Sequence, residues 1–373
     1  ARTERQSDWK RHAEAIALVN KAYQSLQTQR RRDALSRDIL SKGRHVTNEC
    51  DGPVDVAGLR TFVSSPAGRA PRLDQNGRPT LKTLGHVAKD LLTRVQNATA
   101  CNIDTVSHVF IHKNWHYSEL GERLWASGHV VSSREYAVSL DPFMGFGKHV
   151  RWEAHTRFGH DMDDKQSYPT AGLHMIPVGK EICRVYTDNK DVIHAKLGWR
   201  WWGDLLDETT RKDRVKGFFN RLENQGTLHG LYKQFNIPEN QATDVAHMNV
   251  SIGRGVIFRL REYVQIQESR TTWLWDRRPQ MAALVTQAGG RERPQSTLRS
   301  YCNQECEGIS RQAKQRWADW SGHTWFSLEH DGLGVGLYHD TNPTTAEAEA
   351  TVWASRALGY AQTVNIKPMP TAN

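Results

Sequence analysis

The sequence predicts an α+β fold, with a helical N-terminal part, a central mixed-sheet domain and a basic, mixed C-terminal part. Three observations lead to this prediction. Apolar residues recur at helical spacing over the first 100 residues, short runs rich in β-branched and aromatic residues begin near residue 136, and helical periodicity returns after residue 197. The 373 residues are 38% hydrophobic, enough for one large or two ordinary cores. We expect three regions: residues 1–132 with a linker near 64–79, residues 133–240, and residues 241–373.

The N-terminal region predicts two helices. The first runs from Ser7, which can cap it, to about Leu40, with an apolar stripe formed by Ile16, Val19, Tyr23 and Leu26. A cluster of three arginines follows that stripe, and it either contacts phosphate or forms a solvated helix face: Arg30, Arg31 and Arg32. A stretch rich in Pro, Gly and Asn-Gly then marks a loop or linker, and a second helix begins near Thr80.

The central and C-terminal regions alternate between strand-like and helical patterns. The strand-like runs are EYAVSLD, KHVRWEAH, LHMIPV and EICRVYTD, followed after a helical stretch at 197–231 by RGVIFRL and EYVQIQ. Helices are expected near 310–320 and at Thr344–Leu358. The glycine-rich segment LEHDGLGVGLYHD predicts a hairpin or a tight strand.

The charge balance indicates a polyanionic partner. Fifty Lys and Arg residues against 41 Asp and Glu give a net charge of +9, and the isoelectric point is near 9.3. Such an excess favours nucleic acid through counterion release, and the predominance of arginine favours phosphate over a membrane surface. No apolar run reaches about 18 residues, so we expect no membrane partner.

The cysteines and the first residues indicate where the protein works. Five scattered cysteines are typical of a reducing compartment, and the first residues lack an apolar signal core. We therefore expect an intracellular protein, either cytoplasmic or nucleoid-associated, or one enclosed in a virion. Thirteen tryptophans could also serve contacts between copies, which is compatible with a homo-oligomer.

Three acids form the candidate catalytic site. Asp141 and Asp188 each end a strand-like run, and Glu223 lies on a predicted helix. Carboxylates that converge in this way can hold Mg²⁺ or Mn²⁺, which activates a hydroxyl and stabilises the leaving oxygen of a phosphodiester. The alternative is that these are ordinary surface acids.

The segment of about residues 135–230 resembles the ribonuclease H-like superfamily, in particular integrases and transposases of the DDE type. VYTDN is similar to the strand that carries the family's second Asp, and GFFNRLEN to the helix that carries its Glu. The resemblance implies a ribonuclease H-like domain with Asp141, Asp188 and Glu223 as catalytic residues. The chain departs from the family at Lys190, where Gly is usual, and at Lys216, near the family's usual Glu position.

Three histidines form a weaker metal candidate. His108, His112 and His116 share one face at spacings of four residues, which on a helix suits Zn²⁺. The same segment also fits a strand, where the histidines would be spread by about 13 Å per four residues. Buried or surface histidines without a metal are the alternative.

The C-terminal half interleaves arginines with tryptophans. The residues that we expect to bind phosphates or stack on bases are Arg254, Arg259, Arg277, Arg278, Trp273 and Trp275. The alternative places both tryptophans on one strand face in the core, with the arginines pointing to solvent.

These observations support three hypotheses. The first is a metal-dependent nuclease or transposase acting on nucleic acid. The second is a capsid or nucleoprotein subunit that encloses a genome, and the third is a non-catalytic, sequence-specific DNA-binding protein. All three require a salt-dependent affinity for nucleic acid.

Overall fold

The computed structural model describes residues 46–73, 79–137, 148–155, 158–224, 227–238, 248–289, 293–329, 332–338 and 340–369. The helix predicted for residues 7–40, with Arg30, Arg31 and Arg32, and the candidate acid Asp141 therefore lie outside the described residues. The described part is a mixture of helices and small sheets, which confirms the α+β prediction.

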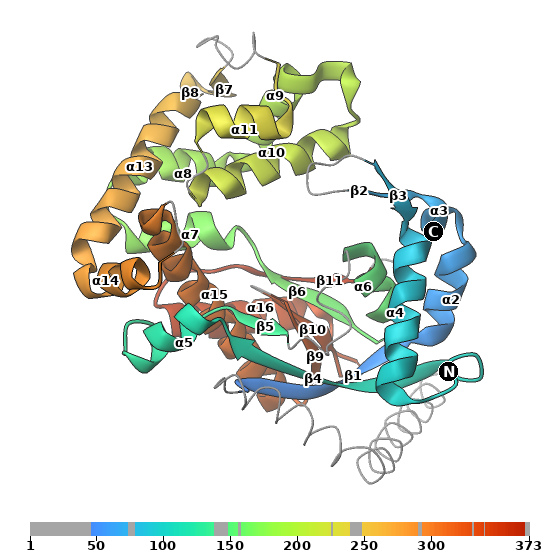
Figure 1. The fold of residues 1–373 in the computed structure, drawn as a ribbon. Coiled ribbons are helices and arrows are strands. Elements are labelled where there is room, and N and C mark those ends of the chain that lie inside the picture. The colour runs from blue at the N-terminus through green and yellow to red at the C-terminus, as the bar shows by residue number, and fades with distance from the viewer. Residues whose placement is uncertain are drawn as a thin grey trace. The chain divides into compact units, whose positions relative to one another are not determined.

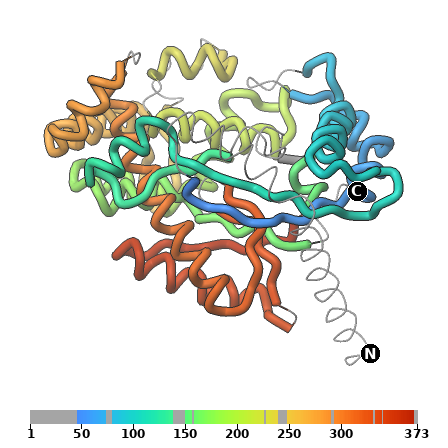
Figure 2. The backbone as a smooth tube through the Cα atoms, turned by 60° about the horizontal axis from the view of Figure 1, so that its bottom comes forward, coloured from blue at the N-terminus to red at the C-terminus, as the bar shows by residue number. Residues whose placement is uncertain are grey.

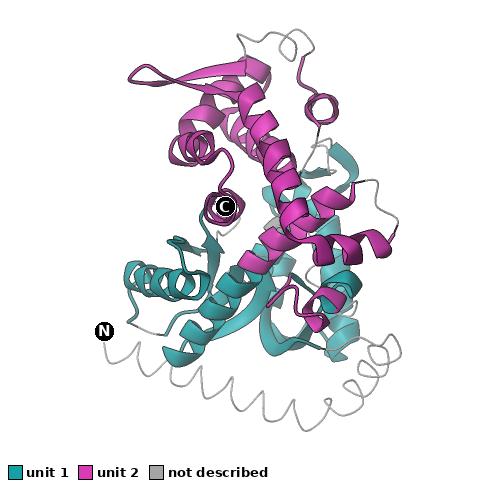
Figure 3. Ribbon diagram, turned by 90° about the vertical axis from the view of Figure 1, so that its left-hand side faces the viewer, with its two compact units in different colours: residues 1–122, 134–165, 307–373 teal, residues 123–133, 166–306 magenta. Residues whose placement is uncertain are grey.

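The chain forms two compact units that are discontinuous in sequence (Figure 3). Unit 1 comprises residues 1–122, 134–165 and 307–373, and unit 2 comprises residues 123–133 and 166–306. Helices α5 (Glu119–Ala126) and α15 (Pro294–Trp320) contribute residues to both units.

Unit 1 contains two sheets, one hairpin and helices that cover them. Its remaining elements are β1 (Asn48–Asp55), α2 (Val56–Ser64), α3 (Pro66–Arg69), β2 (Pro71–Leu73), β3 (Pro79–Thr83), α4 (Leu84–Thr99), β4 (His108–Tyr117), β5 (Glu135–Ala137), α6 (Lys148–His155), β6 (His160–Asp164), β9 (Thr324–Glu329), β10 (Gly332–Gly336), α16 (Pro343–Leu358) and β11 (Val364–Pro368).

The first sheet has the order β1-β4-β5, and the long antiparallel pair β1–β4 runs side by side in Figure 2. One face of this pair is apolar and packs against α2 and α4. Its core is formed by Val54, Val109, Ile111, Leu59, Phe62, Val87 and Leu91. Burial of these side chains, at about 1.5–3 kcal/mol each, holds the helices on the sheet.

The second sheet has the order β11-β6-β10-β9, with antiparallel pairing throughout (Figure 1). Met162, Leu333 and Ile366 face one side, where α16 and the end of α15 cover them. Helix α16 presents alanines at every fourth position, which allow a close approach to the sheet: Ala346, Ala350 and Ala354.

Unit 2 is mainly helical. Its elements are α7 (Ser167–Met175), α8 (Lys180–Asp188), α9 (Lys190–Trp202), η1 (Gly203–Leu205), α10 (Glu208–Glu223), α11 (Leu228–Phe235), β7 (Asn249–Gly253), β8 (Val256–Arg259), α13 (Leu260–Arg277) and α14 (Pro279–Gln287). An aromatic core joins them, with Trp201, Phe218, Phe219, Tyr186, Phe258 and Tyr263 at its centre.

Several predicted elements are confirmed. Strand β8 coincides with RGVIFRL, α15 covers the helix expected near 310–320, and α16 matches Thr344–Leu358 within one residue. The glycine-rich segment contains strand β10, paired with β9. The second predicted N-terminal helix is α4, which begins at Leu84 rather than near Thr80.

Other strand predictions are wrong. KHVRWEAH forms α6, LHMIPV includes the end of α7, EICRVYTD forms α8, and EYVQIQ lies inside α13. In α8, Ile182, Cys183 and Tyr186 recur at steps of one and three residues, so they share one helix face that packs on the core of unit 2. Tertiary packing therefore overrides the β-branched composition of these runs.

Candidate catalytic site on strand β6

Two carboxylates lie on one face of β6. Side chains alternate along a strand, so Asp161 and Asp163 share the face opposite Met162. Met162 is fully buried in the core beneath α16, whereas both aspartates are half-buried. Helix α16 and the end of α15 thus cover one side of the sheet, and the acids lie on the other side.

The neighbouring strand β10 runs close beside these acids. Gly334 is opposite Asp161 in the register, and Gly332 lies next to Asp163. A Cβ at Gly332 would stand 2.4 Å from the Met162 carbonyl oxygen and 3.4 Å from Asp163 Oδ1. The two strands are therefore in close contact at this point, where only glycine fits, and Asp163 Oδ1 accepts a hydrogen bond from the Asp164 backbone N–H at 3.0 Å.

Glu329, the last residue of β9, contributes a third acid to this face. It pairs with Gly332 in the register and makes an ion pair of 2.8 Å with Arg151 of α6. Burial raises the pKa of the Glu329 carboxyl, the Arg151 charge opposes that rise, and the Asp161 carboxylate adds to it. Asp161 and Glu329 therefore interact electrostatically across the sheet.

A lysine and a histidine are buried under the same region. Lys113 Nζ donates to the Phe326 carbonyl oxygen at 3.1 Å and lies 3.5 Å from His155 Nε2. His155 Nδ1 is 2.9 Å from the Pro53 carbonyl oxygen, so that nitrogen carries the proton. Burial, followed by the Lys113 charge, holds the His155 pKa well below its usual value, which keeps the ring neutral.

The strand is fixed from its buried side by an ion pair. Asp164 Oδ1 accepts from Lys314 Nζ at 2.9 Å and from Ser310 Oγ at 3.0 Å, and both charged side chains are almost completely buried. Because Asp164 directly follows Asp163, this anchor sets the position of the acids on the other face.

His330 and Asp331 join β9 to β10 in the sequence and lie outside the described residues. Within the described part of the chain, no group of three or more His, Cys, Asp or Glu side chains is placed to hold a metal ion. Carboxylate oxygens such as those of Asp161 and Asp163 are nevertheless the donors that Mg²⁺ prefers.

The acids singled out from the sequence lie elsewhere. Asp188 is exposed at the end of helix α8, not of a strand, and lines a basic groove of about 740 Å³ with Lys180, Arg184 and Arg254. Glu223 is buried at the end of α10, where Tyr263 donates to Glu223 Oε1 at 3.0 Å. Burial raises the pKa of Glu223, with the Arg299 charge opposing the rise. Glu223 therefore lies in the interior of unit 2.

The three histidines lie on strand β4, so the alternative in which they lie on a helix is wrong. His112 Nδ1 is 2.8 Å from Asp51 Oδ1 and its Nε2 is 3.4 Å from Glu49 Oε2, so acids of the adjacent strand contact this ring. His108, His112 and His116 are separated along the strand by about 13 Å each, too far to share a zinc ion.

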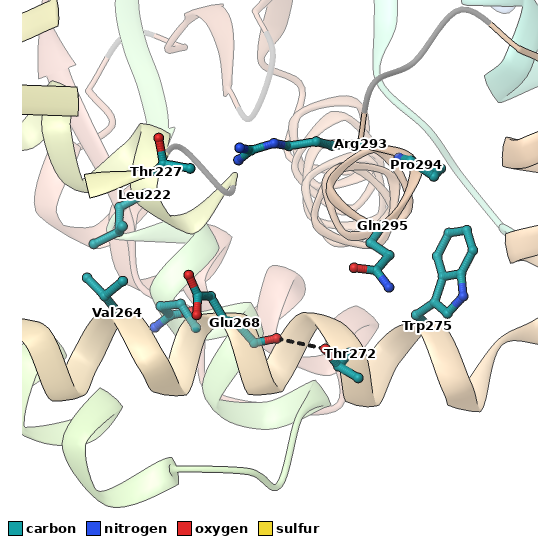
Figure 4. Close-up of a pocket in the computed structure, with 10 residues that line it drawn as sticks. Leu222, Thr227, Val264, Glu268, Thr272, Trp275, Arg293, Pro294 and Gln295 are labelled. Atoms are coloured by element: carbon teal, nitrogen blue, oxygen red, sulfur yellow. Dashed lines mark hydrogen bonds between the residues drawn. The ribbon is translucent and has the colours of Figure 1, made fainter. Parts of the chain in front are cut away.

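The tryptophans of the basic half lie on helix α13, not on a strand. Trp273 is covered by the Arg277 guanidinium, 5.6 Å from the ring centroid. Trp275 lines a polar cavity of about 610 Å³ opposite Arg293, which points across it toward Thr227 (Figure 4). This cavity offers a guanidinium and an indole, the groups expected to contact a phosphate and a base.

The arginines of this region divide into surface and interior groups. Arg259 lies 3.7 Å from Glu262, Arg278 lies 3.6 Å from Glu305, and Arg254 occupies the turn between β7 and β8. Arg299, by contrast, is buried and donates to the Gln267 carbonyl oxygen at 2.9 Å and to Thr271 Oγ1 at 3.0 Å. Arg299 therefore stabilises unit 2 from within.

None of the helices in the described part of the chain combines the length and the apolar character needed to cross a bilayer.

The sheet and its acids define a class of architecture: an antiparallel sheet covered by α16 and the end of α15 on one face, with carboxylates on the other face of strand β6. Neither a scan against protein-family models nor a search of curated protein sequences returns a match. Among solved structures, the chain is similar to the POL domain of Pol1 from M. smegmatis in complex with DNA primer-template and dNTP. The TM-score is 0.51 at 11% identity, and the match covers 86% of this chain and 68% of that chain. The likeness concerns the fold.

Proposed function

We propose that this protein is a divalent-metal-dependent nucleotidyltransferase that extends nucleic acid along a template. The observation that carries the proposal is the pair Asp161 and Asp163 on one face of β6, next to the glycines of β10. The similar fold of a polymerase domain that binds primer-template and dNTP supports it, as does the net charge of +9. The proposal keeps the phosphodiester chemistry expected from the sequence and moves its site away from Asp188 and Glu223.

The residues of β6 have distinct roles in this proposal. Asp161 and Asp163 would hold Mg²⁺ or Mn²⁺ through their carboxylate oxygens. A bound ion of this kind lowers the pKa of an attacking 3′-hydroxyl and stabilises charge on the departing phosphate oxygens. Asp164, held by Lys314, acts as a positioning residue because it fixes the strand that carries the two ligands.

Primer extension tests this function. The purified chain is incubated with Mg²⁺ or Mn²⁺, with a mixture of the four dNTPs or of the four NTPs, and with labelled primers annealed to DNA or RNA templates. We expect template-dependent extension that EDTA abolishes and that Asp161→Asn reduces at least about 100-fold. Absence of extension with every template, nucleotide and metal would refute the proposal.

A further inference from the structure

A groove of about 740 Å³ in unit 2 lies between helix α8 and the hairpin of β7 and β8. Buried aromatic rings fix its two walls to each other. Tyr186 of α8 lies 5.9 Å from Phe258 of β8, measured between the ring centroids, and both side chains are buried in the core of unit 2. The groove therefore keeps its shape without a ligand.

The turn of this hairpin carries an arginine at a position where local chemistry favours other residues. Gly253 pairs with Val256, so the loop consists of Arg254 and Gly255, at the exposed end of the two strands of unit 2 (Figure 3). Their φ angles are 50° and 76°, positive at both positions, as a type I′ turn requires. Asn-Gly is the usual sequence of such a turn, because the left-handed conformation crowds a longer side chain. The chain nevertheless places a guanidinium there, and it lines the groove.

Three exposed cations line the groove: Lys180 and Arg184 from α8, and Arg254 from the hairpin turn. Two exposed acids, Glu181 and Asp188, line it as well. Within the described residues, no ion pair joins either acid to any of the three cations. The groove therefore has an excess of positive charge, and its cations are available to an anionic ligand.

The charges on α8 act beyond their own side chains. Burial lowers the pKa of His174, and the positive charges of Lys180 and then Arg184 lower it further. Lys180 and Arg184 are four residues apart on one face of the helix, a rise of about 6 Å along its axis. This separation is comparable to that of consecutive phosphates in a nucleic-acid strand, so one strand can contact both cations.

The lining of the groove favours contacts with a backbone over contacts with bases. The described lining residues other than the charged ones are aliphatic or amide side chains and a glycine, which include Val185, Ile252 and Val256, so a base finds no aromatic ring to stack on. Guanidinium and ammonium groups bind phosphates and fix the position of a strand without reading its sequence. The net charge of +9 favours nucleic acid over other anions as the source of these phosphates.

We propose that the groove between α8 and the β7–β8 hairpin binds the sugar–phosphate backbone of nucleic acid, with phosphates held by Lys180, Arg184 and Arg254. The site is separate in the chain from the acids of β6 and requires neither a metal ion nor nucleotidyl transfer. Single strands and duplexes share the backbone that it recognises.

Fluorescence anisotropy of the full chain in EDTA, with a labelled oligo-dT and a labelled duplex, tests the proposal. Each phosphate contact contributes about 0.7 on a single strand, or about 0.9 on a duplex, to the slope of log Kd against log salt. Arg254→Asn should lower the slope by that amount on at least one of the two ligands. It should also unfold at the wild-type urea concentration or above, because asparagine suits the turn. Arg254→Lys keeps the charge and should keep the slope.

The double variant Lys180→Gln/Arg184→Gln tests the other wall of the groove. It should lower the slope by about 1.4 on a single strand or about 1.8 on a duplex, because two phosphate contacts are lost. Arg356→Gln is the matched control, because it removes one charge from an exposed arginine of α16, in unit 1. We expect the control to keep the wild-type slope on both ligands.

Wild-type slopes for Arg254→Asn and for the double variant on both ligands, with circular dichroism showing each variant folded, would overturn the inference. So would equal competition by poly-glutamate at the same concentration of charge, because the groove would then bind an acidic polypeptide. The measurement contains no metal ion and no nucleoside triphosphate, so its outcome is independent of the catalytic proposal for β6.

Discussion

The buried ion pair behind β6 makes a quantitative prediction about stability. Asp164 and Lys314 have side-chain exposures of 1% and 0%, and their charged atoms are 2.9 Å apart. Asp164→Asn preserves the shape of the side chain but removes the negative charge that lies 2.9 Å from the buried Lys314 ammonium. Breaking a buried pair by removing one partner costs about 3–5 kcal/mol. That is a large share of the roughly 5–15 kcal/mol by which domains are stable.

Urea unfolding followed by circular dichroism measures this effect. The matched control is Asp90→Asn, because Asp90 and Lys82 form an exposed pair at 3.4 Å with exposures of 55% and 62%. An exposed pair contributes about 0–1 kcal/mol, so the control should unfold at nearly the wild-type urea concentration. If the two variants lose equal stability, or if Asp164→Asn loses less than about 1 kcal/mol, the claim that this pair anchors β6 is refuted.

Three further predictions concern stability and reactivity. Gly332→Ala should destabilise the protein by about 1–3 kcal/mol in the same urea assay, because its Cβ would stand 2.4 Å from the Met162 carbonyl oxygen; wild-type stability would contradict this. Burial lowers the pKa of His194 to about 3, below its unfolded value of about 6.5, so the unfolded chain binds more protons between these values and stability should fall as pH drops from 7 to 4. His194→Gln should flatten that dependence, and an unchanged pH profile would rule the explanation out. With a thiol reagent at pH 8, the half-buried Cys50 and Cys101 should react at once in the folded protein, and the buried Cys183, Cys302 and Cys306 should react only in urea. Prompt reaction of all five cysteines in the folded protein would contradict this burial.

The parts of the fold that the sequence predicted are those with strong local signals. Helix α16 begins at Pro343, directly after Asn342, whose side chain caps it, and ends at the C-cap Gly359, which has the left-handed conformation at φ 74°. These residues mark helix ends by their own backbone chemistry. The glycines of β10 likewise indicated a tight strand, because a side chain at those positions meets the neighbouring strands.

The strand errors arose where local composition and tertiary packing disagree. The run EICRVYTD is rich in β-branched and aromatic residues, yet its apolar members also fit one helix face, and the core of unit 2 selects the helix. Periodicity in so short a run does not distinguish the two states. The wrong prediction that Asp188 ends a strand followed from interpreting this run as a strand.

The acids of β6 were missed because their strand has little local character. HDMDD contains one apolar residue, Met162, and becomes a strand through pairing with β10 and β11, which lie about 170 and 200 residues further along the chain. One signal was present: a His-Asp pair occurs both in HDMDD, which forms β6, and directly before β10 in the sequence LEHDGLGVGL. Only the sheet register shows that Asp161 and Gly334 are neighbours.

The rate of single-nucleotide addition by Asp163→Asn tests the central claim most directly. The substitution removes one negative charge from β6 without changing the side chain's size, and Asp340→Asn, at an exposed acid of unit 1, controls for the same chemical change. With saturating Mg²⁺, primer-template and nucleotide, we expect the Asp163→Asn rate to fall at least about 100-fold, while Asp340→Asn keeps the wild-type rate. A wild-type rate for Asp163→Asn would show that the carboxylates of β6 do not carry the chemistry.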